Sequence, residues 1–111
     1  MEISVKQYKH CDLLSIQGKV DSYTAPDLTK AIETLNDNGQ FKIVLDLGGL
    51  DYMSSAGFRA LLIGQRNCKR YNRGEIVLAR VPKKICDALE LTGFTPLFRI
   101  FEDATAAVGG F

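Results

Sequence analysis

The stretch that decides the fold is FKIVLDLGGLDYMSSAGFRALLIGQRNCKRY, from Phe41 to Tyr71. Its first half, Lys42–Leu47, is an apolar and β-branched run typical of a buried strand, and Gly48-Gly49 predict a turn after it. From Ser55 onward the apolar residues recur at helical spacing. The adjacent serines Ser54 and Ser55 stand at the junction, just before the helix, and there we expect the function to lie.

The two serines have a structural and a functional interpretation, which do not exclude each other. In the structural one, Ser54 is an N-cap whose hydroxyl accepts a hydrogen bond from a free backbone N–H, which contributes about 1 kcal/mol. In the functional one, the exposed Ser55 hydroxyl accepts a phosphate, because a helix N-terminus offers unpaired N–H groups and a partial positive charge. Such a phosphate would change what the surface binds and leave the fold intact.

Projected at about 100° per residue, the helix after Ser55 has one narrow stripe of small and apolar residues, which we expect to face the sheet. The stripe consists of Gly57, Leu61, Gly64 and Cys68, flanked by Ala60 and Tyr71. The opposite side carries Arg59, Arg66, Lys69 and Arg70, with Leu62 beside them and Phe58 at the margin. The ordinary interpretation of this side is a solvated face. The alternative is a docking surface for an acidic partner.

The rest of the chain is interpreted from residue alternation and turn residues. The expected strands are residues 2–8, 13–17, 75–81 and 97–101, the first two forming a hairpin around a turn at 9–12. The expected helices run from Thr24, as the cap, to Asn38-Gly39, and from Pro82 to Gly93, with a final helical turn from Asp103 to Val108. Residues 18–23 are expected to be a connection and residues 109–111 a frayed tail.

This order of elements implies one α/β domain over residues 1–111. We expect a mostly parallel mixed sheet of four to five strands, an antiparallel edge from the N-terminal strands, and about four helices. In sheets of this type the functional loops gather at the carboxyl ends of the strands. The loop that holds Ser54 and Ser55 follows such an end.

Composition and charge narrow the class of protein. The chain has 14 Lys and Arg against 13 Asp and Glu, a net charge of +1 that gives no global attraction to nucleic acid or anionic membrane. Cys11, Cys68 and Cys86 are too far apart for a disulfide framework or a zinc site and favour reduced thiols. No signal peptide or membrane-spanning run is recognised, so we expect a cytoplasmic protein without membrane insertion.

The motifs of common enzymes are missing from the sequence. There is no phosphate-binding GxxxxGK loop, no dinucleotide fingerprint and no histidine close to either serine. The single histidine, His10, falls in the predicted hairpin turn and is expected to be a solvated loop residue. Asp46 and Asp51 are better explained by structural roles at a strand end than as a catalytic carboxylate pair. We therefore expect no catalytic residue, no metal site and no cofactor.

Three segments resemble, in order, the signatures of the STAS domain family, which is named for sulphate transporters and anti-sigma factor antagonists. They are Gly18–Leu28 (GKVDSYTAPDL), Val44–Leu47 (VLDL) and Tyr52–Phe58 (YMSSAGF). With 111 residues and no second module, the chain resembles the free-standing bacterial anti-sigma factor antagonists.

The resemblance implies a phosphoprotein that regulates transcription by partner switching. In that family the unphosphorylated antagonist binds an anti-sigma factor, which is also a serine kinase, and so frees the sigma factor. Phosphorylation ends the binding, and a serine phosphatase restores it. The usual motif is Met-Asp-Ser-Ser/Thr-Gly-Leu, with the phosphate on the serine after the acid. Matched by position, that serine is Ser55, and Ser54 replaces the acid and becomes a competing acceptor.

The resemblance also outlines a partner-binding surface around Ser55. Its expected members are Asp21, Ser22, Tyr23, Thr24, Met53, Ser54, Ser55, Ala56, Gly57, Phe58, Leu62, Arg66 and Lys69. Apart from the family, Asp21 reads as a turn former. The alternative function is that of a STAS binding subunit of a transporter or lipid-trafficking complex that is not phosphorylated, which Ser54 in place of the acid favours. A monomer or weak dimer is expected.

Overall fold

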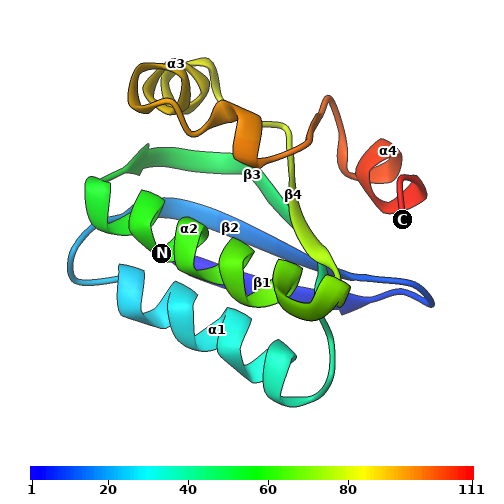
Figure 1. Cartoon of the computed structure of the whole chain (residues 1–111). Coiled ribbons are helices and arrows are strands. Elements are labelled where there is room, and N and C mark those ends of the chain that lie inside the picture. Colours follow the sequence, from blue (N-terminus) through cyan, green and yellow to red (C-terminus); the bar gives the residue numbers. More distant parts are fainter.

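The computed structural model describes all residues from Met1 to Phe111 as a five-stranded sheet with helices packed against it (Figure 1). The strands are β1 (Glu2–Gln7), β2 (Asp12–Val20), β3 (Lys42–Met53), β4 (Glu75–Ala79) and β5 (Ile100–Phe101). The helices are α1 (Ala25–Asp37), α2 (Ser55–Lys69), α3 (Lys83–Thr92) and α4 (Ala104–Gly109). Short 3₁₀ turns lie at Arg70–Asn72 and Thr95–Leu97.

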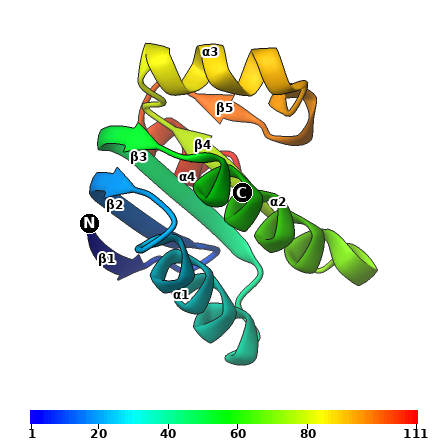
Figure 2. The same ribbon diagram turned by 90° about the vertical axis from the view of Figure 1, so that its left-hand side faces the viewer.

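The sheet is mixed, as the sequence predicted. Its strands lie in chain order, with β1 antiparallel to β2 and all other neighbours parallel. Helices α1 and α2 lie side by side on one face, and α3 lies near the β5 edge (Figure 2). The main core includes Leu14, Leu28, Leu45, Leu61 and Leu78. A smaller core on the other face includes Val44, Val77 and Ala107 of α4.

Two strands are longer than predicted. β3 continues through Gly48-Gly49 to Met53, and β2 continues through Gly18 to Val20. The two glycines make room for neighbouring side chains and do not form a turn. A Cβ on Gly48 would lie 2.5 Å from Cζ of Arg80, and one on Gly49 would lie 2.7 Å from Cγ of Gln17. The register between β2 and β3 shifts at two places, and the two strands stay paired up to Val20 and Met53.

The helix ends follow their sequence signals more closely. Gly93 adopts a φ of 75° after α3, and the N–H of Phe94 donates to the carbonyl of Leu89 at 3.0 Å. The carboxylate of Asp103 accepts from the N–H of Ala106 at 2.7 Å and caps α4. These two predictions are therefore confirmed.

The C-terminal region differs from expectation in three ways. The predicted strand over 97–101 is reduced to β5, because residues 95–97 form a 3₁₀ turn. β4 ends at Ala79, and the next residue, Arg80, has a φ of 51°. Val81 therefore lies outside the strand. The tail is packed, because Phe111 is half-buried against the smaller core.

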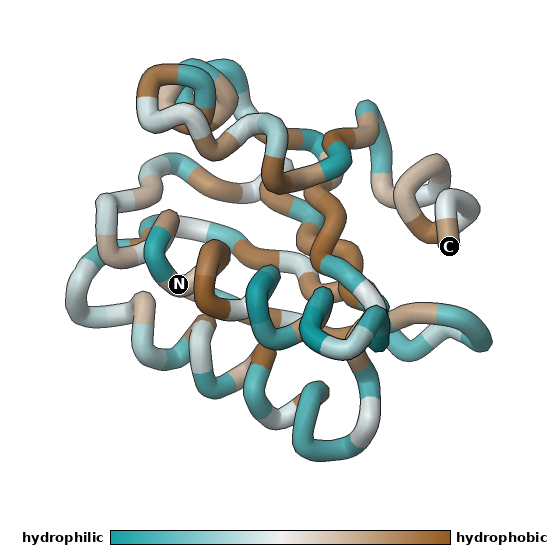
Figure 3. The backbone as a smooth tube through the Cα atoms, in the orientation of Figure 1, coloured by the Kyte–Doolittle hydropathy of each residue, from teal (hydrophilic) through white to brown (hydrophobic).

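Hydropathy follows this architecture, with the apolar stretches on the central strands and hydrophilic residues along the outer turns of α1 and α2 (Figure 3). None of the helices combines the length and apolar character needed to cross a membrane.

Candidate functional site

The ends of β2 and β3 bring two loops together. Val20 and Met53 are register partners, and the N–H of Ser54 donates to the carbonyl of Val20 at 2.7 Å. The loop before α1, Asp21–Thr24, therefore lies beside the first turn of α2. Both loops are at the carboxyl ends of parallel strands, where binding sites of open sheets are found.

Asp21 shapes the first loop. Its Oδ1 accepts from the N–H groups of Tyr23 at 2.9 Å and Thr24 at 3.0 Å. These hydrogen bonds, that of Thr24 foremost, hold the pKa of the Asp21 carboxyl below its usual range. The turn-forming role expected of Asp21 is confirmed, and the turn leaves Tyr23 91% exposed.

Thr24 stands before α1 as predicted, but its hydroxyl does not cap the helix. It accepts from the N–H of Asp21 at 2.9 Å and donates to the carbonyl of Lys19 at 3.1 Å. The Thr24 side chain therefore stabilises the loop before α1 and does not cap the helix.

Ser54 occupies the N-cap position of α2 with extended backbone angles, as predicted. The predicted hydrogen bond is absent, because its Oγ makes no bond to the first turn and is buried without a partner. The first N–H groups of a helix have no acceptor within it. In α2 these N–H groups belong to Ser55, Ala56 and Gly57. The Ser54 hydroxyl accepts a hydrogen bond from none of them.

Ser55 is the first residue of α2 and is exposed. Its side chain therefore lies at a helix N-terminus without a side-chain cap, and in reach of another protein. The partial positive charge of this helix end favours an anionic group there.

Part of the expected surface of α2 is buried. Met53 is 6% and Phe58 7% exposed, and Gly57 is buried as well. A Cβ on Gly57 would lie 2.6 Å from Cγ of Met53, so glycine lets the first turn lie close on the sheet. Leu62 is half-buried and packs against the main core. The burial of Gly57 agrees with its place on the predicted buried stripe, whereas the expectation that Leu62 stays open on the charged side of the helix was wrong, because Leu62 packs against the core.

Gln65 explains why this side of the helix is covered. Its Nε2 donates to the carbonyl of Leu97 at 2.6 Å, which holds the 95–97 turn beside the Phe58 and Leu62 side of α2. At the other end of the helix, Tyr71 is 77% exposed with a φ of 60° and does not flank the buried stripe. The rest of that stripe, Gly57, Ala60, Leu61, Gly64 and Cys68, is buried as predicted.

The exposed side of α2 faces away from that turn. Along it lie Ser55, Arg59, Ile63, Arg66, Lys69 and Arg70. Ile63, which is 40% exposed, is the apolar residue that the core leaves open. A groove of about 600 Å³ separates this side from α1, with Ser22 and Pro26 on one wall and Arg59 and Ile63 on the other.

The comparisons with known proteins agree with this architecture. The family model described as "Mlab, STAS domain" matches residues 3–99. The chain belongs to the STAS domain family. A protein of Bordetella bronchiseptica, the provisionally named anti-sigma factor antagonist BtrV, is 31% identical over 111 residues, which cover 100% of this STAS domain and 95% of the relative.

Solved structures share the fold of this STAS domain. The anti-sigma factor antagonist SpoIIAA in its unphosphorylated form superposes with a TM-score of 0.81 at 15% identity, over 99% of this chain and 98% of that one. Bacillus SpoIIAA in the phosphorylated form gives 0.78 at 14% identity, over 98% of each chain. The predicted family and fold class are thereby confirmed.

The exposed residues around Ser55 extend beyond the predicted set. Tyr52 is 51% exposed one position before Met53, and Arg59 and Ile63 continue from Ser55 at four-residue steps. The sequence shows the spacing of four residues, but it does not show whether the Leu62 side or the Ile63 side of α2 is exposed. Asp46 is no catalytic partner of Asp51, because both its oxygens bind Arg80 at 2.9 Å.

Proposed function

We propose that this STAS domain is an anti-sigma factor antagonist that phosphorylation at Ser55 switches off. The observation that carries the proposal is the exposed Ser55 hydroxyl on the first turn of α2, whose N–H groups lack a side-chain cap. The relative BtrV and the fold neighbour SpoIIAA are both named as anti-sigma factor antagonists, which supports the same role here.

The unphosphorylated protein binds an anti-sigma factor, and this binding releases the sigma factor that the anti-sigma factor held. The anti-sigma factor is a serine kinase, it phosphorylates Ser55, and a serine phosphatase reverses the step in the cytoplasm. SpoIIAA has been solved in phosphorylated and unphosphorylated forms, which supports a switch of this kind. A phosphate adds about −1.5 to −2 charge, which opposes binding to an acidic partner surface and is costly to bury.

The docking surface follows from the exposed and half-buried residues around Ser55. It comprises Asp21, Ser22, Tyr23, Thr24, Tyr52, Ser54, Ser55, Ala56, Arg59, Ile63, Arg66 and Lys69. Tyr23, Tyr52 and Ile63 supply exposed apolar area, and large aromatic side chains are common anchors of protein interfaces. Arg59 and Arg66 supply positive charge, which complements an acidic partner and increases the rate of encounter.

The decisive experiment compares single variants at the two serines. Ser55→Ala is expected to bind the cognate anti-sigma factor in the presence of ATP as tightly as the unphosphorylated wild type, and Ser55→Asp to bind at least tenfold more weakly. Ser54→Ala is the matched control and should remain a substrate. Intact-mass measurement and peptide mapping after incubation with the kinase locate the phosphate.

Equal affinity of Ser55→Ala and Ser55→Asp would contradict the switch, as would a phosphate found on Ser54 alone. Capture of partners from the native cytosol separates the proposal from its alternative. An anti-sigma kinase supports it, and a transporter ATPase recovered in its place supports a binding subunit of a transport complex.

A further inference from the structure

β1 forms an open edge of the sheet. It lies at the end of the strand order, so β2 is the only strand beside it (Figure 2). Its register with β2 is unbroken from Glu2 to Gln7, and its sequence, EISVKQ, contains no proline. Proteins commonly interrupt an exposed edge with a bulge or a proline, because its free backbone groups can pair with another strand. β1 has neither and is therefore open to strand pairing.

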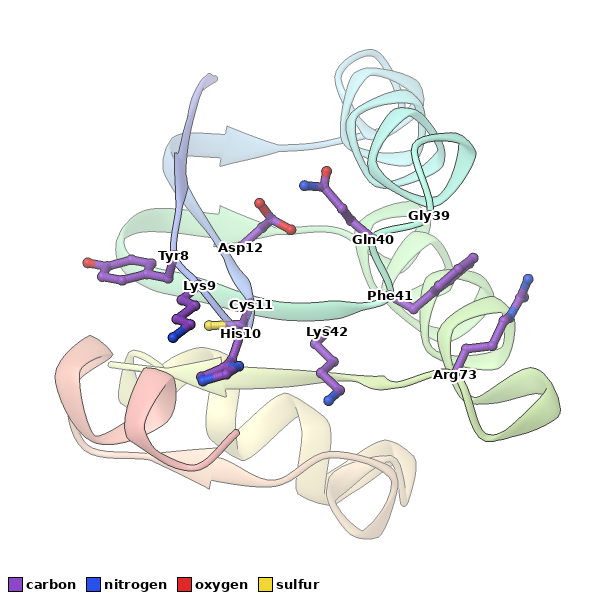
Figure 4. Close-up of a pocket in the computed structure, with 10 residues that line it drawn as sticks. All are labelled: Tyr8, Lys9, His10, Cys11, Asp12, Gly39, Gln40, Phe41, Lys42 and Arg73. Atoms are coloured by element: carbon purple, nitrogen blue, oxygen red, sulfur yellow. The ribbon is translucent and has the colours of Figure 1, made fainter.

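The hairpin turn decides which backbone groups of β1 are free. The turn lies between Tyr8 and Cys11 (Figure 4), and the N–H of Tyr8 donates to the carbonyl of Cys11 at 2.9 Å. Hydrogen-bonded and non-hydrogen-bonded residue pairs alternate along two antiparallel strands. Counted back from Tyr8, the N–H and carbonyl groups of the even-numbered residues of β1 therefore point to β2. The residues whose groups point to the open side are Ile3, Val5 and Gln7.

The side chains of β1 divide between the two faces of the sheet. Ile3 and Val5 lie opposite Ile16 and Leu14, so they point to the face that α1 and α2 cover. Ile3 packs against the main core, whereas Val5 is 50% exposed. The other face carries the polar side chains of Glu2, Ser4 and Lys6. The edge thus has one apolar row, which the chain covers only in part, and one polar row.

The polar row ends in two opposite charges. Glu2 and Lys6 are both exposed and belong to neither ion pair of the structure. The Nζ of Lys6 lies 5.2 Å from the ring centre of Tyr8. Ser4 stands midway between the two charges. A second β1 that runs in the opposite direction about Ser4 therefore places each charge opposite its complement.

We propose that two copies of this protein associate through their β1 strands, which pair antiparallel about Ser4. In this register Glu2 faces Lys6 of the second copy, and Ile3 faces Val5. The backbone agrees with this register, because the free groups of Ile3 and Val5 can bond to each other in both directions. Opposite charges and apolar side chains that face each other across neighbouring strands stabilise a sheet.

Other registers fit less well. The free backbone groups allow only registers that keep odd-numbered residues opposite each other. A register centred on Val5 places Lys6 opposite Ser4. It also places Ile3 opposite Gln7. A register centred on Ile3 leaves Lys6 beyond the end of the paired segment, so only the register about Ser4 pairs both charges.

The pairing joins the two sheets into one and leaves the docking surface around Ser55 free, because no residue of that surface lies on β1. Antiparallel pairing places the two Ser55 side chains at opposite ends of the joined sheet. β1 has six residues, whereas a standard interface has about 20–30 residues on each side. The dimer is therefore expected to be weak, and it does not depend on the proposed switch.

Sedimentation equilibrium of the full chain from micromolar to millimolar concentration tests the association. The wild type is expected to change from monomer to dimer over this range. Amide NMR spectra of ¹⁵N-labelled protein locate the contact. The signals of residues 2–7 should shift with concentration, whereas those of residues 54–63 should not.

Charge variants test the register. Lys6→Glu sets acidic side chains opposite each other and Glu2→Lys sets basic ones, so each variant alone should dimerise at least tenfold more weakly than the wild type. An equimolar mixture of the two variants should associate as well as the wild type, because each charge then meets its opposite. Lys83→Glu, at an exposed position of α3, is the control and should leave the dissociation constant unchanged. The spectrum of each variant checks its fold.

Three results overturn the proposal. A wild type that stays monomeric at millimolar concentration does not pair through β1. A mixture of the two variants that associates no better than either alone shows that Glu2 and Lys6 do not face each other. Concentration-dependent shifts confined to residues 22–33 and 56–63 place the contact in the groove between α1 and α2.

Discussion

Gln65 is a buried polar side chain that takes the place of a strand partner. β5 pairs only with Leu78 and Ala79, so the outer edge of β4 is open at Ile76. Gln65 accepts from the N–H of Ile76 at 2.6 Å and donates to its carbonyl at 3.0 Å. One side chain thus connects α2, β4 and the turn before β5.

Replacing Gln65 by Leu should reduce stability strongly. The N–H and carbonyl of Ile76 would be left buried without partners, at about 1–3 kcal/mol for each group, so we expect a loss of about 2–5 kcal/mol in urea denaturation. Gln7→Leu, on the exposed β1 strand, is the control and should stay within about 0.5 kcal/mol of wild type. Similar losses in both variants would contradict the role of Gln65.

The raised pKa of Asp12 predicts that the stability of the protein depends on pH. Burial raises this pKa, which means that the folded protein holds the Asp12 proton more tightly than the unfolded chain does. The ionised carboxylate therefore destabilises the fold at neutral pH, and this cost disappears as the pH falls through the raised value towards the unfolded one, about 4.

Asp12→Asn removes this titration. We expect the free energy of unfolding of the variant to exceed that of wild type most at pH 7, and the difference to decrease as the pH approaches 4 from above. Urea denaturation across that pH range measures it. A difference that is independent of pH would show that Asp12 does not titrate between the two states.

At the scale of elements, α2 connects the proposed switch to the core. Its inner side is fixed by small residues such as Gly57 and Gly64 and by Gln65, while Ser55, Arg59 and Ile63 remain on the outside. The proposed phosphate on Ser55 would therefore change the charge of the exposed side without entering the packed one. In the proposed switch the helix is a rigid support for the docking surface.

Charge reversal on the exposed side of α2 tests the docking surface. Arg59→Glu with Arg66→Glu should lower the association rate with the anti-sigma factor by about tenfold at low ionic strength, and less at high salt. Lys6→Glu with Lys9→Glu, on the distant hairpin, makes the same change in net charge and is the control. If stopped-flow measurements show equal effects, net charge alone is responsible and the assigned surface is wrong.

At the scale of the whole molecule, the C-terminus closes the second core. The apolar residues Val44, Val77 and Ala79 point away from α1 and α2, and α4 covers them with Ala107. Phe111 packs at the edge of this cluster. The last residues of the chain are thus part of the fold.

Phe111→Ala should be destabilising. Full burial of Phe is worth about 3–5 kcal/mol on truncation to Ala, and for this half-buried ring we expect a loss of about 1–2 kcal/mol, measured by urea denaturation. Tyr23→Ala, which removes a 91% exposed ring, should have no measurable effect. A neutral Phe111→Ala would restore the frayed tail that the sequence suggested.

The sequence alone determined the order of the elements, the mixed sheet, the helix ends at Gly93 and Asp103, and the position of the two serines. These depend on local patterns, such as alternation, helical period and turn residues, which act over a few positions. The sequence does not show where β2 and β3 end, because glycine commonly marks a turn, whereas Gly48 and Gly49 make room for the side chains of Arg80 and Gln17.

Only the tertiary structure decided which side of α2 is open, because the turn bound by Gln65 approaches from residues some 30 positions away. It also decided that Phe111 packs against the smaller core and that Asp12 is buried with its Oδ1 lacking a hydrogen-bond partner. Burial and charge clustering depend on contacts between segments that are distant in the chain. The sequence pattern of a helix does not show which of its faces a distant segment will cover.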